Sequence, residues 1–110
     1  MSHQHRELAA GRWNLLSFAE QMANIGSEIE RTISRKKKGR PEISTRAFER
    51  ALELIDLTVA DAKNLTRLRE LLRVRESLAD HFYFDNFYRS TQESWQRYFN
   101  CFLIAARGRR

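Results

Sequence analysis

The sequence is poor in the residues that build turns, disulfides and membrane spans. Its 110 residues include four Gly, one Pro and one Cys. A sheet of short strands needs Gly, Pro, Asn or Asp turns about every 8–12 residues, and that spacing is missing. The single Cys allows no internal disulfide and is typical of a reducing compartment. No stretch approaches the roughly 18 uninterrupted apolar residues of a membrane helix, and the N-terminus lacks a signal-peptide core. We therefore expect a soluble, cytoplasmic, all-α protein.

Familiar catalytic and metal-binding motifs are missing as well. The sequence has no glycine-rich phosphate loop, no CxxC or HExxH zinc motif and no Glu-x-x-His pair of a di-iron bundle. His3 and His5 lie in an unpatterned terminal segment, where a metal site is not expected. Cys101 falls at the edge of an apolar helix face, which predicts a buried, unreactive thiol. These absences predict no metal and no cofactor, and they favour a protein that is not an enzyme.

The residues that are present suit a single helical domain. Apolar residues make up 42% of the chain and charged residues 31%, and the length is that of one domain. We expect residues 1–12 to form a flexible segment, residues 13–107 to form the domain and residues 108–110 to form a basic tail. Gly26 lies beside the apolar stripe of the first patterned segment, where a missing side chain allows another helix to approach closely.

Apolar residues recur at steps of three and four in four segments. The first two segments predict helices over residues 15–38 and 44–58. A capping box at Thr58 and Asp61 opens a third helix that runs to residue 84. A capping box at Ser90 and Glu93 opens a fourth helix that runs to residue 107. Short connections make neighbouring helices antiparallel, so the sequence predicts an up-and-down four-helix bundle. Nine of the twelve aromatic residues lie between residues 82 and 102. Their helical spacing predicts that they pack in the core.

The second predicted helix is apolar over a wide arc. Its inward stripe comprises Ala47, Phe48, Ala51, Leu52 and Ile55. Leu54 and Leu57 fall outside that stripe. A wide arc indicates contact on two sides, either within the bundle or at a subunit interface, so we also expect self-association into a homo-oligomer.

The third predicted helix carries an arginine among its apolar residues. Its inward side chains are expected to be Leu65, Leu68, Leu71, Leu72, Leu78, Ala79 and Phe82. At about 100° per residue, Arg75 falls in the middle of that arc. Because arginine keeps its charge when buried, it needs carboxylate or carbonyl partners. Either Arg75 forms a buried ion pair with Glu20, Glu28 or Asp56, or it belongs to a site that stabilises an anion.

Arg75 also begins a short motif that includes His81 and Tyr83. The stretch Arg75-Glu-Ser-Leu-Ala-Asp-His81-Phe-Tyr83 resembles the R-x4-6-H motif of HEPN domains, small helical bundles that include metal-independent ribonucleases acting as dimers. The resemblance implies that Arg75 and His81 contact RNA phosphate and assist attack by the 2′-hydroxyl, and some members carry a Tyr in the position of Tyr83. Glu76 departs from the Asn that commonly follows this Arg, and its charge would repel phosphate. A toxin-type ribonuclease is therefore the alternative function.

A second resemblance covers more of the chain. Residues 23–31, 46–58 and 95–107 are similar to a family of small bacterial and archaeal helical proteins with no known activity. The likeness extends over most of residues 15–107. It implies one compact domain and gives no mechanism.

The positive charge behind the net charge of +6 is concentrated in ten residues, 31–40. Six basic residues and no acid lie between Arg31 and Arg40, and Gly39 with Pro41 predicts that a helix ends there. We use the name basic turn for its last five cations, Arg35, Lys36, Lys37, Lys38 and Arg40. Such a run can be a solvated helix end that complements the negative end of the helix dipole. It can also contact the phosphates of nucleic acid, without sequence preference because the segment has no aromatic ring for base stacking.

The leading hypothesis is a non-enzymatic helical-bundle module. It would contact nucleic acid, or a protein that handles nucleic acid, through the basic turn. No exposed apolar face flanks the basic turn, so no membrane contact is expected. Besides the ribonuclease, a purely structural protein–protein adaptor is the remaining alternative.

Overall fold

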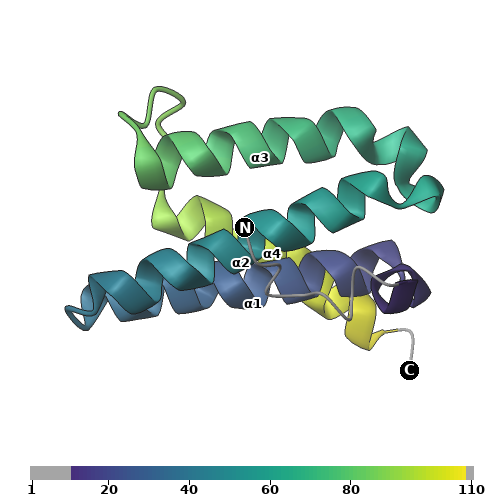
Figure 1. The fold of residues 1–110 in the computed structure, drawn as a ribbon, viewed down its shortest axis with the longest axis horizontal. Coiled ribbons are helices and arrows are strands. Elements are labelled where there is room, and N and C mark those ends of the chain that lie inside the picture. The colour runs from purple at the N-terminus through teal and green to yellow at the C-terminus, as the bar shows by residue number, and fades with distance from the viewer. Residues whose placement is uncertain (1–10, 109–110) are drawn as a thin grey trace.

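The computed structural model describes residues 11–108, and they form a four-helix bundle (Figure 1). Its helices are α1 (Phe18–Lys37), α2 (Pro41–Ala60), α3 (Leu68–Tyr83) and α4 (Gln92–Arg107). Two short 3-10 helices, η2 (Trp13–Leu15) and η3 (Ala62–Arg67), precede α1 and α3. Successive helices alternate in direction, which confirms the predicted up-and-down topology. His3, His5, most of the predicted flexible segment and residues 109–110 of the tail lie outside the described residues.

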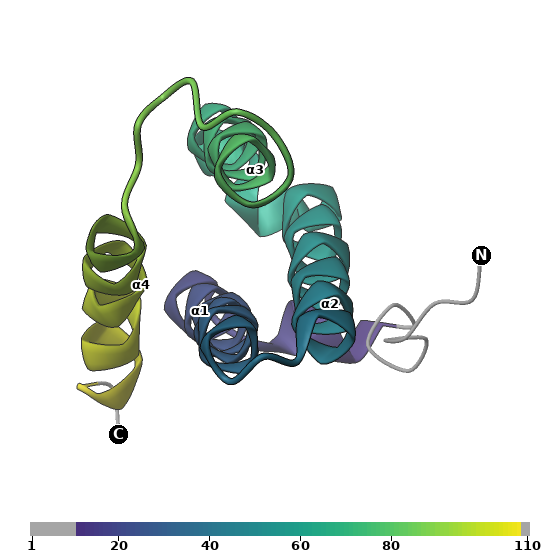
Figure 2. The same cartoon turned by 90° about the vertical axis from the view of Figure 1, so that its left-hand side faces the viewer.

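The α1–α2 hairpin is the centre of the molecule. Viewed from one end, α1 lies between α2 and α4, and α3 packs against α2 (Figure 2). The buried apolar side chains form one cluster that includes Trp13, Met22, Ile25, Ile29, Ile33, Phe48, Ala51, Leu54, Ile55, Leu71, Val74, Leu78, Trp95 and Phe99. None of the helices within residues 11–108 is long and apolar enough to cross a membrane.

The wide apolar arc of α2 is covered within the chain. Leu54 is buried, and Leu57 packs against the core although it lies outside the predicted stripe. Both are needed inside the bundle because α2 packs on α1 and also on α3. The two-sided contact is therefore intramolecular. Homo-oligomer formation stays a prediction, and this arc no longer argues for it.

Most helix ends lie within three residues of the predicted ones, but α3 begins only at Leu68, after η3 and well beyond the predicted cap at Thr58. Ser17 and Glu20 form the capping box of α1, so Leu15, the first residue of the predicted helix, precedes α1 and is exposed. The predicted capping box at Thr58 is wrong: Thr58 lies buried inside α2, and Asp61 caps η3 instead. The capping box of α4 joins Thr91 and Ser94, one residue after the predicted pair.

The buried face of α3 is rotated from the predicted one. Leu71, Val74 and Leu78 are buried, whereas Leu65 and Leu72 are exposed. At about 100° per residue, the centre of the buried face lies roughly 80° from that of the predicted stripe, toward Val74. Leu65 lies in η3, before the α-helical register begins at residue 68. The rotation moves Arg75 from the middle of the buried arc to its edge.

Two further burial predictions are wrong. Cys101 is exposed, because α4 covers α1 through a narrow face that includes Trp95 and Phe99. Tyr83, Phe84, Phe87 and Tyr88 are also exposed, although they belong to the aromatic stripe predicted for the core. The last three of these rings lie beyond the end of α3, where no helix turns them inward.

Candidate nucleic-acid interface

The basic turn connects α1 to α2 through a Schellman motif. Gly39 occupies the left-handed region with φ of 73°, which costs glycine little. Its N–H donates to the carbonyl of Lys36 at 3.1 Å, and the N–H of Arg40 donates to the carbonyl of Arg35 at 2.9 Å. These two hydrogen bonds satisfy carbonyls that the end of α1 would otherwise leave open. The backbone of the basic turn is therefore fixed.

The start of α2 holds the basic turn in place. Pro41 is the first residue of α2, a position that its fixed φ and missing N–H suit. One turn later, the buried Ser44 hydroxyl donates to the carbonyl of Thr32 at 2.7 Å and ties α2 to α1. The basic residues thus stand at the tip of a rigid hairpin.

The cations of the basic turn face solvent and lack partners. Lys36, Lys37, Lys38 and Arg40 are exposed, and Arg35 is half-buried. Within residues 11–108 the structure gives none of the five an ion pair with a carboxylate. Arg31, one turn earlier, is paired with Glu28 at 3.0 Å. The unpaired positive charge therefore begins after Arg31 and ends at Arg40.

Arg75 forms an ion pair at the surface and not in the core. Its Nε donates to Asp56 Oδ1 of α2 at 2.8 Å, so one of the three expected acids is its partner. The side chains of Arg75 and Asp56 are 39% and 57% exposed. The hydrogen bond from Arg75 to Asp56 raises the pKa of the guanidinium. The expected buried ion pair is thus corrected to a half-exposed bridge between α2 and α3.

None of the hollows found within residues 11–108 is lined by Arg75, His81 and Tyr83 together. Arg75 lines a hollow with Phe84 and Phe87, whereas Tyr83 lines a cavity with Lys36 and Phe48. The imidazole of His81 packs edge-on against Phe82, and its Nδ1 is buried without a hydrogen-bond partner. The Arg75 guanidinium is held by Asp56, which opposes phosphate binding there. The ribonuclease alternative stays a prediction.

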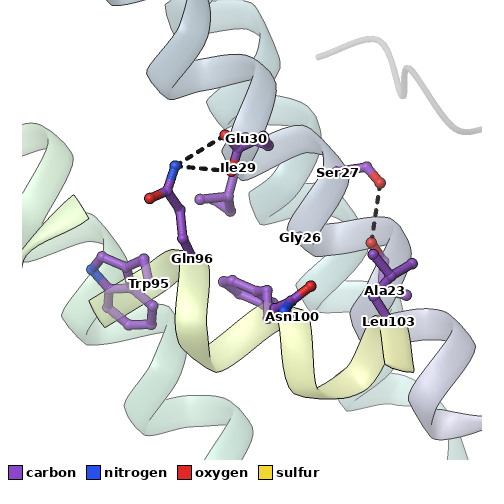
Figure 3. A pocket seen from close by; sticks show the side chains of 10 residues that line it. Ala23, Gly26, Ser27, Ile29, Glu30, Trp95, Gln96, Asn100 and Leu103 are labelled. Carbon is purple, nitrogen blue, oxygen red and sulfur yellow. Dashed lines mark hydrogen bonds between the residues drawn. The ribbon is translucent and has the colours of Figure 1, made fainter. Parts of the chain in front are cut away.

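A groove of about 170 Å³ between α1 and α4 offers little chemistry (Figure 3). Three of its polar side chains are already hydrogen-bonded: Gln96 donates to Glu30 at 3.0 Å, and the Ser27 hydroxyl donates to the carbonyl of Ala23 at 3.2 Å. Ile29, Trp95 and Leu103 supply apolar walls. Across residues 11–108, no group of three or more His, Cys, Asp and Glu side chains gathers to hold a metal ion.

Sequence reasoning missed a buried polar network beneath the start of α1. It joins Trp13, Gln21, Thr58, Asp61 and Asn64, all of which are buried. Gln21 donates to the carboxylate of Asp61 at 2.8 Å and accepts from Asn64 at 2.8 Å. The only signal in the sequence was Gln21 itself, a polar residue at helical spacing from the apolar Phe18 and Ile25. Since these groups satisfy one another, the network holds the fold together and leaves nothing free for a ligand.

Comparisons with family models, with curated proteins and with solved structures found no match to this chain.

Proposed function

We propose that this chain is a non-enzymatic binding module that contacts the phosphates of nucleic acid through the basic turn. The observation that carries the proposal is the cluster of five unpaired cations within six residues on a fixed hairpin tip. Lys and Arg side chains that contact phosphates release condensed counterions, and this release drives sequence-independent binding. The fixed backbone adds to affinity, because little chain entropy is lost when the cations meet a phosphate backbone.

The beginning of α2 adds to the positive potential of the basic turn. Arg40, the residue before α2, makes no side-chain cap, and the first turn of α2 holds one acidic residue, Glu42. A helix N-terminus carries a partial positive charge of about half a unit. The turn therefore presents this charge and the five side-chain cations at the same tip, which suits a phosphate backbone.

The dependence of affinity on salt tests the proposal. Affinity for a generic oligonucleotide should be micromolar or weaker near physiological salt, and the log–log slope against salt should be about −3 to −5 if most of the five cations engage. The double variant Lys37→Gln, Lys38→Gln should make that slope shallower by about 1.5–2 and leave the melting temperature unchanged.

The matched control is Arg97→Gln, Arg107→Gln on α4. Both arginines are exposed, and the double variant removes the same net charge as the lysine variant. It should leave the slope within about half a unit of wild type. Equal slopes for the lysine variant and wild type would contradict the proposal and favour the adaptor hypothesis.

A further inference from the structure

The chain between α3 and α4 forms a built loop with exposed aromatic rings. We call residues 84–91 the aromatic loop. The carboxylate of Asp80 on α3 accepts hydrogen bonds from the backbone N–H groups of Phe87 at 2.8 Å and Tyr88 at 3.0 Å. Its backbone carbonyl accepts from the N–H of Asn86 at 3.1 Å. These bonds anchor the aromatic loop to the last turns of α3.

Further contacts fix the shape of the aromatic loop. Asn86 and Arg89 both have φ of 54°, a left-handed conformation that is unfavourable for residues other than glycine and needs support from the surroundings. Asn86 supplies part of it by donating to the carbonyl of Ser90 at 2.9 Å and accepting from the N–H of Ser90 at 3.1 Å. The Tyr88 hydroxyl donates to Glu76 at 3.0 Å. Despite this order, Phe84 and Phe87 remain 72% and 81% exposed.

These rings are continuous with the basic turn. The basic turn and the aromatic loop lie at the same end of the molecule (Figures 1 and 2). Lys36 and Tyr83 line one cavity of about 100 Å³, and the Tyr83 ring lies 6.5 Å from the Phe84 ring. Phe84 and Phe87 then line one hollow with Tyr88. A path of aromatic surface thus runs from the basic turn across the end of the bundle.

The path ends at a second group of cations. Tyr88 lines a hollow on the face of α3 together with Arg69 and Arg73. Both arginines are exposed, and the structure gives neither an ion pair. Four carboxylates lie beside the path. Glu76 and Asp80 accept the hydrogen bonds that hold the aromatic loop, whereas Asp85 is exposed within the loop and the charge of Glu49 acts on Tyr83. Exposed aromatic rings therefore have unpaired cations at both ends of the path.

We infer that the ligand of the basic turn is single-stranded nucleic acid, whose bases stack on Phe84, Phe87 and Tyr88. The inference rests on the proposed function and adds the form of the ligand. Aromatic platforms beside cations bind single strands with little sequence preference, because every base has a face that can stack. In a duplex the base faces are covered by neighbouring bases, so these rings gain nothing from it. The cations at both ends favour an anionic strand over an uncharged protein surface.

The test compares a labelled 20-nucleotide oligo(dT) with a 20-base-pair duplex by fluorescence anisotropy. Wild type should bind the single strand more tightly than the duplex. The variant Phe84→Ala, Phe87→Ala should weaken single-strand binding about 10- to 100-fold and leave the duplex affinity unchanged. Its salt slope should match that of wild type, because it removes no charge. Since both rings are exposed, the variant should keep its helix content and melting temperature.

A matched control and a direct optical signal complete the test. Leu15→Ala, Leu65→Ala removes two side chains that are 85% and 74% exposed and precede α1 and α3, away from the aromatic loop, and it should leave both affinities unchanged. Phe87→Trp keeps a stacking ring and should retain single-strand affinity. Since Trp13 and Trp95 are buried, the emission of the new indole should be quenched by oligo(dT) and not by the duplex.

The outcomes separate this inference from the proposed function. If Phe84→Ala, Phe87→Ala binds oligo(dT) like wild type while Lys37→Gln, Lys38→Gln has a shallower slope, the stacking inference is wrong and the proposed function stands. Absence of binding to either oligonucleotide would overturn both. If the aromatic variant instead converts an oligomer to a monomer in light scattering and binds oligo(dT) like wild type, the aromatic loop is a protein interface, which also overturns the inference.

Discussion

Asp61 lies in the buried network that ties three elements together. Its side chain caps η3 by accepting from the N–H of Lys63 at 3.2 Å, and it also pairs with the Lys63 ammonium. Gln21 reaches it from α1, and the same amide nitrogen of Gln21 donates to the carbonyl of Trp13 at 3.1 Å. A buried carboxylate is tolerated only when such partners replace water. The stability of this end of the bundle therefore depends on the charge of Asp61.

We predict that Asp61→Asn lowers the free energy of unfolding by about 1–3 kcal/mol at neutral pH, since it removes the charge and replaces one of the two oxygens that accept from Gln21 and Lys63 with a donor. Burial alone would raise the pKa of Asp61, but the hydrogen bonds from Lys63 and Gln21 outweigh it and lower the pKa below 3.8. The contribution of the carboxylate is then fully present above about pH 3.8 and is lost as the pH falls through the folded-state pKa.

Urea unfolding at several pH values between 7 and 3 measures this effect. The difference between wild type and Asp61→Asn should shrink below about pH 4. Asp85→Asn is the control, because Asp85 is an exposed loop residue. It should track wild type at every pH. A difference for Asp61→Asn that is constant down to pH 3 would show that the charge of Asp61 contributes nothing.

Arg75→Ala should lower the free energy of unfolding by no more than about 1 kcal/mol. The ion pair with Asp56 is half-exposed, and exposed pairs contribute little because solvent screens them and their side chains lose entropy. A fully buried pair would instead lose about 3–5 kcal/mol on removal of one partner. Thermal and urea unfolding distinguish the two values. A loss well above 2 kcal/mol would mean that Arg75 is desolvated in solution.

The sequence predicted the partner of Arg75 to within three acids, but it placed the pair in the core and not at the surface. Asp56 was among the three acids considered for Arg75, because a charge near an apolar stripe needs a partner on a neighbouring helix. The exposure of Cys101 and Phe87 could not be predicted in the same way. Periodicity defines a helix face, but burial also depends on how far the neighbouring helices extend around it.

At the scale of elements, the contact of α1 with α4 depends on Gly26. A Cβ built at Gly26 would lie 2.7 Å from the Cβ of Phe99, closer than two such atoms can approach. The sequence predicted a close helix approach at this glycine, and the structure identifies α4 as the helix. Gly26 faces α4 at the groove shown in Figure 3.

Gly26→Ala should destabilise the protein by about 1–3 kcal/mol, because the extra methyl group forces α1 and α4 apart. Elsewhere in a helix interior the same exchange stabilises by up to about 1 kcal/mol. Gly108→Ala is the control, because its Cβ would meet only backbone oxygens at 3.5 Å and beyond. Melting curves of both variants check the sign. A higher melting temperature for Gly26→Ala would mean that the helices have room to separate.

Helix existence and order followed from the sequence, whereas helix ends and one helix face did not. Four patterned segments became four helices because period and punctuation agree, as at Gly39. The predicted capping box at Thr58 failed because the hydroxyl of Thr58 instead accepts from the indole of Trp13 at 3.0 Å, a contact between residues 45 positions apart. The sequence predicted the basic turn, but it did not predict that the aromatic loop lies near it. Only the folded chain brings the aromatic loop to the same end.

At the scale of the whole molecule, the four helices are not equally supported. The core pair α1 and α2 pack along each other, α4 covers the other side of α1, and α3 packs chiefly on α2 (Figure 2). α3 buries Leu71, Val74 and Leu78, and α4 buries Trp95 and Phe99, but α4 contacts α1 much more extensively than α3 contacts α2. Segments with few buried contacts open at lower free energy than the rest of a protein. The helix that carries the aromatic loop is therefore the one most easily released.

We predict that the rates of amide hydrogen exchange follow how extensively each helix packs on its neighbours. Amides of residues 71–80 in α3 should exchange about tenfold or more faster than those of residues 47–58 in α2, an opening free energy lower by about 1.4 kcal/mol or more. Exchange monitored by mass spectrometry on peptides from the native chain measures the ratio. Leu78→Ala enlarges the difference, because Leu78 is fully buried and its loss weakens the contact of α3 with the core. Equal protection of α2 and α3 would mean that the bundle opens only as a whole, and α3 would then present the aromatic loop from a scaffold as stable as the central hairpin.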